Sequence, residues 1–334
     1  MPLFFAPTES KGEVMKEARL IAILLAAFAT IAFATPPASA QDKLKLALGQ
    51  RGNWDTAIAE LGQGAGIFRK HGLELEILWT QGAGESQQAV ISASVDIGLA
   101  GTLAAFGAYQ KGAPLRIVAA EATSAADFWY VRADSPIHGI KDLDGKTIAY
   151  STTGASTHTL VLAFLKQGAA AGRPVATGGP SPTFTQVMSG QVDVGWSAPP
   201  FGLDALQDNK IRRVARASDV PIGRDQTIRA LVTTAGALKT RPDVFRRFVQ
   251  GYRDSIDWMY AGDEALKAYA EFARIRLDLA RRVRDAFFPK KLVWPDQVRG
   301  LDTLMEDGVT FKYLREPLTK QQLAEMIQIP APAN

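Results

Sequence analysis

Short apolar runs alternate with longer amphipathic segments between residues 44 and 120. The apolar runs, which end near glycine or polar turn residues, are residues 44–48, 75–79, 95–99 and 115–120. The spacing of apolar positions between these runs predicts helices at residues 56–70, 85–92 and 103–111. Strands that alternate with helices through short glycine-containing loops favour β-α-β units and a mostly parallel sheet, and this pattern indicates the α/β fold class.

The same plan recurs further along the chain. A predicted strand at residues 146–150 is followed by the loop Ser151–Gly154 and by a predicted helix at residues 155–167. In addition, residues 188–196 match residues 91–99 nearly position for position. Two copies are too few for a repeat array, so we predict two similar α/β lobes.

The remaining residues, 242–334, have a helical pattern. Five apolar side chains fall on one face of the first predicted helix, namely Val244, Phe248, Tyr252, Ile256 and Met259. Further helices are predicted at residues 263–275, 277–287 and 295–307.

The N-terminal region has the pattern of a secretory signal peptide at residues 1–40. Lys16 and Arg19 precede an apolar run at residues 20–34, and Ala38-Ser39-Ala40 has the small residues of a cleavage site. The run is shorter than the roughly 20 residues that span a bilayer, which favours cleavage over a retained anchor. Met15 is an alternative start of translation. The mature chain is therefore expected in the periplasm.

Composition excludes several classes of protein. The 334 residues suffice for two domains of roughly 150 residues each. The net charge is +4 and the basic residues are scattered, which argues against a nucleic-acid partner. The absence of cysteine excludes disulfides, thiolate nucleophiles and cysteine-ligated metals, and the three histidines lie far apart in sequence. We therefore expect no metal and no cofactor.

Several short motifs resemble those of one protein family. In chain order they are Ala65–Leu73 (AGIFRKHGL), Val95–Gly98 (VDIG), Asp134–Ile137 (DSPI), Lys141–Ala149 (KDLDGKTIA) and Gly190–Val194 (GQVDV). In this order they are similar to the periplasmic solute-binding proteins of ABC importers, of the nitrate/sulfonate/taurine-like type. The resemblance extends over residues 44–259.

This resemblance implies a two-lobed periplasmic binding protein fold, type II-like, with two crossing hinge strands and C-terminal helices. The crossings would be residues 128–132 outward and 227–233 back. Lobe 1 would comprise residues 41–129 and 231–334, and lobe 2 the inserted residues 130–230. The protein would be a monomer that binds a small-molecule ligand between the lobes and presents it to an ABC permease in the inner membrane.

Four loops carry the candidate binding chemistry. Ligands of open α/β sheets lie beyond the carboxyl ends of the strands, and the loops predicted there are rich in Gly, Ser and Thr. Glycine allows close approach to the backbone, and helix N-termini offer N–H groups to an oxoanion. The candidate ligand-binding residues in and near these loops are Asn53, Trp54, Gly82, Gly84, Glu85, Gly101, Thr102, Asp127, Ser151, Thr153, Gly154, Ser156, Thr157 and Trp196.

Each candidate also has a purely structural interpretation. Ser and Thr before a helix commonly cap it, and Gly commonly serves turn geometry. Trp54 and Trp196 are equally suited to a ligand wall and to core packing. Glu85 is either a first-turn carboxylate that the helix dipole favours or a partner for the ammonium group of a zwitterionic ligand. His158 is either a half-buried polar residue or a ligand contact.

The sequence favours a binding protein for a small anionic or zwitterionic solute, such as a sulfonate, nitrate or taurine. One alternative is a binder of a thiamine-pyrimidine precursor or another small organic molecule. Another is an enzyme on the same fold. The two enzymes that resemble this family in fold depend on cysteine, which this chain lacks, so we expect no enzymatic activity.

Overall fold

The computed structural model describes residues 1–4 and 41–332. The predicted signal peptide, including its cleavage position after Ala40, lies outside the described residues apart from residues 1–4. Within the described residues, no helix is both long enough and apolar enough to cross a membrane.

The first lobe is built on a five-stranded mixed sheet with strand order β2-β1-β3-β10-β4. Its strands are β1 (Asp42–Gly49), β2 (Leu73–Thr80), β3 (Ile97–Gly101), β4 (Leu115–Thr123) and β10 (Thr227–Thr234). β1 is parallel to both β2 and β3, with Leu46 opposite Ile77 on one side and Ile97 on the other. β10 runs antiparallel between β3 and β4, which places a strand from late in the chain inside the first sheet.

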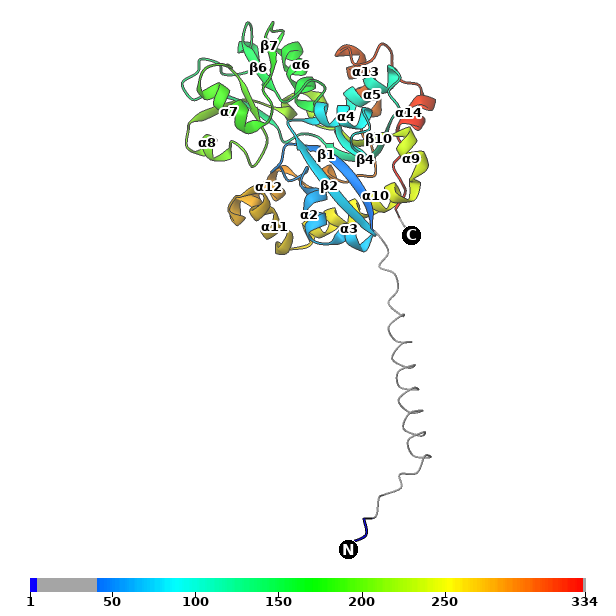
Figure 1. Ribbon diagram of the computed structural model, residues 1–334. Helices are drawn as coiled ribbons and strands as arrows, with labels where there is room; N and C mark the ends of the chain where they lie inside the picture. Colours follow the sequence, from blue (N-terminus) through cyan, green and yellow to red (C-terminus); the bar gives the residue numbers. More distant parts are fainter. Residues whose placement is uncertain (5–40, 333–334) are drawn as a thin grey trace. The chain divides into compact units, whose positions relative to one another are not determined.

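The second lobe contains two smaller sheets. An antiparallel sheet has the order β8-β5-β9, and a parallel pair joins β6 to β7. The strands are β5 (Phe128–Arg132), β6 (Thr147–Tyr150), β7 (Arg173–Ala176), β8 (Gly195–Ser197) and β9 (Ile211–Arg216). The helices of this lobe are α6 (Ser156–Gly168), α7 (Pro180–Met188) and α8 (Leu203–Gln207), and Figure 1 shows these green elements gathered apart from β1 and β2.

The helices of the first lobe lie on both faces of its sheet. They are α2 (Ile58–Gly64), α3 (Ile67–Lys70), α4 (Ala83–Ile91), α5 (Thr102–Gln110), α9 (Ala235–Thr240), α10 (Pro242–Ala261), α11 (Asp263–Ala273), α12 (Leu277–Phe287), α13 (Leu301–Thr310) and α14 (Lys320–Met326). The apolar face predicted for α10 is buried, because all five of its residues pack into a core shared with β1, α2, α11 and α12.

Two linkers join the lobes. Residues 124–127 connect β4 to β5, and residues 217–226 connect β9 to β10. Each of β5 and β10 belongs to a single sheet, so the crossings are made by these linkers next to the strands. The linkers are bonded to each other, because the Ser124 N–H donates to the Gln226 carbonyl (2.9 Å) and the Ala217 N–H donates to the Asp127 carbonyl (2.9 Å).

The duplicated Val-Asp segment has the same role in both lobes. A carboxylate oxygen of Asp96 accepts a hydrogen bond from the Lys45 N–H in β1 at 2.8 Å. A carboxylate oxygen of Asp193 accepts one from the Thr147 N–H in β6, also at 2.8 Å. The aspartate therefore ties the strand that follows it to β1 in the first lobe and to β6 in the second. The two copies lie in different sheets.

Three predicted helices differ from the observed ones. The helix predicted at residues 56–70 is broken into α2 and α3, because Gly66 adopts φ 73°. The helix predicted from residue 85 begins at Ala83. The helix predicted from residue 295 begins only at Leu301, because the preceding backbone pairs with the sheet: the Pro295 carbonyl accepts from the Ala120 N–H at 2.8 Å.

Candidate ligand-binding site

The structure brings three of the predicted loops together at the contact between the lobes. The Gly84 N–H of the first lobe donates to Thr152 Oγ1 of the second lobe at 3.1 Å. A Cβ atom added at Gly84 would lie 2.1 Å from the Thr153 carbonyl oxygen, and one added at Gly101 would lie 2.3 Å from that of Gly154. Only glycine permits this approach, so the loops touch each other directly.

The Ser and Thr side chains of the 151–157 loop stabilise the loop itself. Thr157 Oγ1 accepts from the Ser151 N–H at 3.0 Å and lies 2.9 Å from the Ser151 hydroxyl. Thr153 is exposed, and its hydroxyl lies 3.3 Å from that of Tyr150. Gly154 adopts φ 86°, a left-handed conformation that favours glycine. These contacts support the structural interpretation of Thr157.

Little space remains where the loops meet. A small cavity of about 10 Å³ is lined by Gly101, Thr102 and Ser156, with Thr159 and apolar neighbours. This volume is near the lower limit for one water molecule. A larger solute therefore requires the loops of the two lobes to move apart.

Three predicted ligand contacts have hydrogen-bond partners within the protein. Trp54 is fully buried in the core, where its indole N–H donates to Tyr260 Oη at 2.8 Å. The buried Trp196 donates its indole N–H to the Gly178 carbonyl at 3.2 Å. Glu85 is exposed, and its carboxylate accepts from the Gln81 N–H at 2.9 Å, as a first-turn carboxylate of α4 does. These positions favour the structural interpretation of all three.

His158 also belongs to the structural framework. Its ring lies 4.4 Å from that of Tyr150 between centroids, and its Nδ1 lies 3.2 Å from Tyr313 Oη. Burial lowers the pKa of His158, which favours the neutral ring.

A buried charged cluster lies where the linkers join the sheets. The guanidinium of Arg229 in β10 contacts Asp55, and its Nε donates to Glu121 of β4 at 2.8 Å. Its Nη1 lies 3.7 Å from an oxygen of Asp127 in the first linker. We call these four residues the hinge cluster.

Only Asp127 of the hinge cluster was expected from the sequence. A usable signal was present, because Glu121 follows an apolar run of β4 and Arg229 is the single charge of β10. Such a charge is expensive to bury without a partner, so each predicts an opposite charge nearby.

Burial raises the pKa of two carboxyl groups of the cluster. It raises the pKa of Glu121 to about 7 and that of Asp127 to about 6, although Arg229 acts in the opposite direction. Three carboxyl groups share one guanidinium, so the cluster carries more potential negative than positive charge.

Four buried oxygen atoms have no hydrogen-bond partner among the described residues and lie near the same edge of the first sheet. They are Asn53 Oδ1, Thr102 Oγ1, Glu121 Oε1 and Asp127 Oδ1. Their residues lie close to the carboxyl ends of β1, β3 and β4. These three strands run in the same direction, because β1 is parallel to β3 and β10 is antiparallel to both β3 and β4. All four atoms accept hydrogen bonds, so this edge suits a ligand with N–H or O–H donors.

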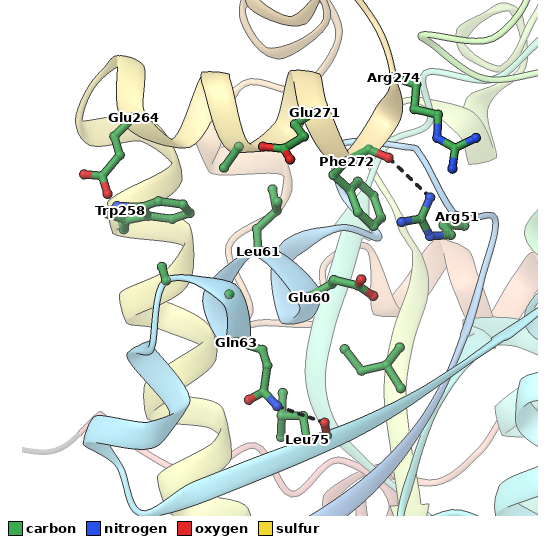
Figure 2. A pocket seen from close by; sticks show the side chains of 14 residues that line it. Arg51, Glu60, Leu61, Gln63, Leu75, Trp258, Glu264, Glu271, Phe272 and Arg274 are labelled. Carbon is green, nitrogen blue, oxygen red and sulfur yellow. Dashed lines mark hydrogen bonds between the residues drawn. The ribbon is translucent and has the colours of Figure 1, made fainter.

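A wider groove includes Arg51 of the predicted loop at residues 50–54. It measures about 900 Å³ and lies among α2, β2, α10 and α11. Figure 2 shows Trp258 and Glu264 near one end of it and Arg51 and Arg274 near the other. Arg51 Nη1 donates a hydrogen bond to the Phe272 carbonyl at 3.3 Å. The described residues contain no group of three or more His, Cys, Asp or Glu side chains suited to a metal ion.

Solved structures share this fold. The aliphatic sulphonate-binding protein SsuA of Escherichia coli is 16% identical, with a TM-score of 0.64 over 87% of this chain and 94% of that one. The nitrate-binding protein NrtA of Synechocystis PCC 6803 is 14% identical, with a TM-score of 0.65 over 85% and 84%. The desulfurization enzyme DSZB is 17% identical, with a TM-score of 0.59 over 87% and 97%. The fold is therefore the two-lobed α/β fold of periplasmic binding proteins.

Sequence comparison identifies the family. No curated protein matches the chain significantly. The family described as NMT1/THI5 like matches residues 55–265, which is more than half of the chain. The chain therefore belongs to the NMT1/THI5-like family.

Proposed function

We propose that this chain is the extracytoplasmic solute-binding component of an ABC importer. It captures a small solute between its two lobes and delivers it to a permease in the inner membrane. The family, the fold and the meeting of loops from both lobes at the carboxyl ends of β2 and β3 support this role. The expected boundaries, residues 41–129 with 231–334 and residues 130–230, cut through β5 and β10. We therefore place the lobe boundaries in the two linkers, residues 124–127 and 217–226.

The buried unpartnered acceptors carry the proposal for the solute's chemistry. Asn53, Thr102 and Asp127 are candidate contacts whose oxygens lack partners among the described residues. The neighbouring hinge cluster has three carboxyl groups for one guanidinium. An ammonium group would satisfy such acceptors, whereas a simple oxoanion would be repelled. The N–H groups of the glycine loops suit an anionic group. A zwitterion such as an aminosulfonate therefore fits better than nitrate.

Binding and lobe closure are linked in this proposal. Because the loops touch, the solute enters an open form and then favours the closed one by contacting both lobes. The candidate contacts are Asn53, Thr102 and Asp127 on the first lobe and its linker, and the backbone of residues 151–154 on the second.

A thermal-shift titration with matched compounds tests the solute class. Taurine and ethanesulfonate differ by one ammonium group, and nitrate lacks the organic part. We expect taurine to raise the melting temperature more than ethanesulfonate, and nitrate least. Native mass spectrometry of protein from its own periplasm would identify the natural solute. A protein without bound solute that none of these compounds stabilises would contradict the proposal.

Two variants test the site. Asp127→Asn removes the charge and should weaken binding of an ammonium-bearing ligand about tenfold or more, as for a charged hydrogen bond. Glu85→Gln, at an exposed residue of α4, is the matched control and should change affinity less than twofold. Equal effects of the two substitutions on ligand affinity would show that Asp127 does not contact the ligand.

The alternative is an enzyme, because DSZB shares the fold. The chain contains no cysteine, so a cysteine-dependent reaction is excluded. Incubation of the purified protein with the identified solute, followed by mass spectrometry of the solute, distinguishes the two roles. A binding protein returns the solute unchanged.

A further inference from the structure

A second groove, separate from the candidate ligand-binding site, is lined by three arginines. It measures about 720 Å³. Arg212 and Arg213 come from β9 of the second lobe, and Arg282 comes from α12 of the first. Leu203, Leu206, Ile211 and Phe287 form its apolar walls, and Ala133, Gln207 and Asn209 complete it. We call it the arginine groove.

The charges in the arginine groove are not balanced by the protein. No Asp or Glu is among the residues that line it. Among residues 41–332, the Arg212 side chain donates only to the Ser135 carbonyl, at 2.7 Å. Arg213 and Arg282 form no side-chain hydrogen bond or ion pair with the described residues. By contrast, Arg281, next to Arg282 on α12, pairs with Asp263 at 3.0 Å.

Carboxylates near the arginine groove are already engaged. Asp208 pairs with Lys210 at 2.9 Å, and Asp285 pairs with Arg284 at 2.6 Å. Asp219 accepts from the Arg216 N–H at 2.7 Å. Partial burial and the neighbouring Arg216 lower the pKa of Arg213, against the attraction of Asp219. The guanidinium nevertheless stays charged at neutral pH, so its charge is left for an outside partner.

The groove spans the contact between the lobes. Leu203 packs against both apolar clusters, one of which contains α12 and the other the core of the second lobe. Arg213 of the second lobe and Arg282 of the first therefore line the same groove. An anion between them would be attracted to both lobes.

We propose that the arginine groove binds a small organic anion and that the bound anion ties the two lobes together. Its carboxylate, sulfonate or phosphate head contacts Arg213 and Arg282, since guanidinium groups match such oxygens in charge and geometry. Its apolar part lies against Leu206 and Phe287. The volume is within the range of small-molecule sites. This inference does not depend on which solute the candidate ligand-binding site takes.

Calorimetric titration with phenyl phosphate tests the proposal. Inorganic phosphate lacks the apolar part and phenol lacks the charge, so we expect phosphate to bind about tenfold more weakly and phenol not to bind. Affinity for phenyl phosphate should fall as ionic strength rises. Equal affinities for phenyl phosphate and inorganic phosphate would overturn the proposed apolar contact.

Substitutions on both lobes locate the site. Arg213→Gln and Arg282→Gln should each weaken phenyl phosphate binding about tenfold or more. Arg281→Gln, at the neighbouring position that does not line the groove, should change it less than twofold. Circular dichroism checks that each variant is folded. Unchanged affinity in both groove variants would place the anion elsewhere, and an effect of only one would overturn the bridging of the lobes. An equal loss in Arg281→Gln would indicate non-specific attraction to a basic surface.

Discussion

Arginine side chains have opposite environments in the hinge cluster and in the arginine groove. Arg229 is buried with three carboxylates around it. Arg213 and Arg282 line an open groove without any carboxylate. In the first case the protein supplies the counter-charge, and the arginine supports the fold at the junction of the lobes. In the second case the counter-charge is missing, and the arginines are available to a ligand.

The largest expected difference between the two regions is in stability. Arg229→Gln leaves Glu121, Asp55 and Asp127 buried without their cation and should lower the free energy of unfolding by about 3–5 kcal/mol. Arg282→Gln should change it by less than about 0.5 kcal/mol, since it removes no contact. Urea denaturation measures both. Arg229→Lys, which keeps the charge, should lose less than Arg229→Gln. Equal stability losses at residues 229 and 282 would contradict the comparison.

The hinge cluster should also make stability depend on pH. Burial raises the pKa of Glu121 from 4.5 to about 7 and that of Asp127 from 3.8 to about 6. At a pH between the ordinary and the raised pKa of each group, the folded protein keeps a proton that the unfolded chain has lost. The cluster therefore contributes most below about pH 4, and this contribution is lost as the pH rises towards 7.

Urea denaturation at a series of pH values, with and without Glu121→Gln, measures this dependence. The glutamine cannot ionise, so the fall in stability between pH 4 and 7 should become shallower. Glu85→Gln, at an exposed position, should leave the slope unchanged. If Glu121→Gln leaves the slope of stability against pH unchanged, groups other than Glu121 cause the pH dependence.

The contact between Gly101 of the first lobe and Gly154 of the second involves no charged group. Gly101→Ala would place a Cβ atom 2.3 Å from the Gly154 carbonyl oxygen, so the loops must separate. We expect a loss of about 1–3 kcal/mol in the free energy of unfolding, as for overpacking. Gly64→Ala is the matched control, because nothing lies within 4 Å of its Cβ position. Equal stability of the two variants would show that the loops tolerate separation freely.

The smallest expected effect is in the 151–157 loop. Thr157→Ala removes the acceptor of the Ser151 N–H and should lower stability by about 1 kcal/mol. Thr153→Ala, at the exposed position of the same loop, should have a smaller effect. Thermal denaturation of both variants measures the difference. A larger loss of stability in Thr153→Ala than in Thr157→Ala would show that the Thr153 hydroxyl, and not that of Thr157, stabilises the loop.

Local patterns predicted much of the fold. Helical spacing identified the buried face of α10, since Val244 and its four partners all lie in the core. The repeated Val-Asp segment indicated two related lobes, and the structure shows the same strand contact in both copies. Such features depend on neighbours in sequence, which a sequence displays directly.

Contacts between distant segments could not be predicted in the same way. Nothing local to residues 227–234 indicates that β10 pairs with both β3 and β4. Consequently the pairing of Arg229 with Glu121 stayed hidden, although each charge stands out in its own strand. Trp54 lies directly after a glycine-containing loop, as a ligand contact would, but its ring packs against Tyr260 and Tyr269 from the C-terminal helices.

The position of β10 also determines the order in which the first lobe is completed. Thr123 in β4 and Thr227 in β10 are hydrogen-bonded neighbours at 2.9 Å, although 104 positions separate them in the chain. While the polypeptide is being made, β3 and β4 must wait for the entire second lobe before the strand between them exists. Long-range pairing of this kind slows folding, because the closing of so long a loop precedes the contacts that stabilise it. Ribosomal synthesis therefore reaches the last third of the chain before the first sheet acquires the strand that joins β3 to β4.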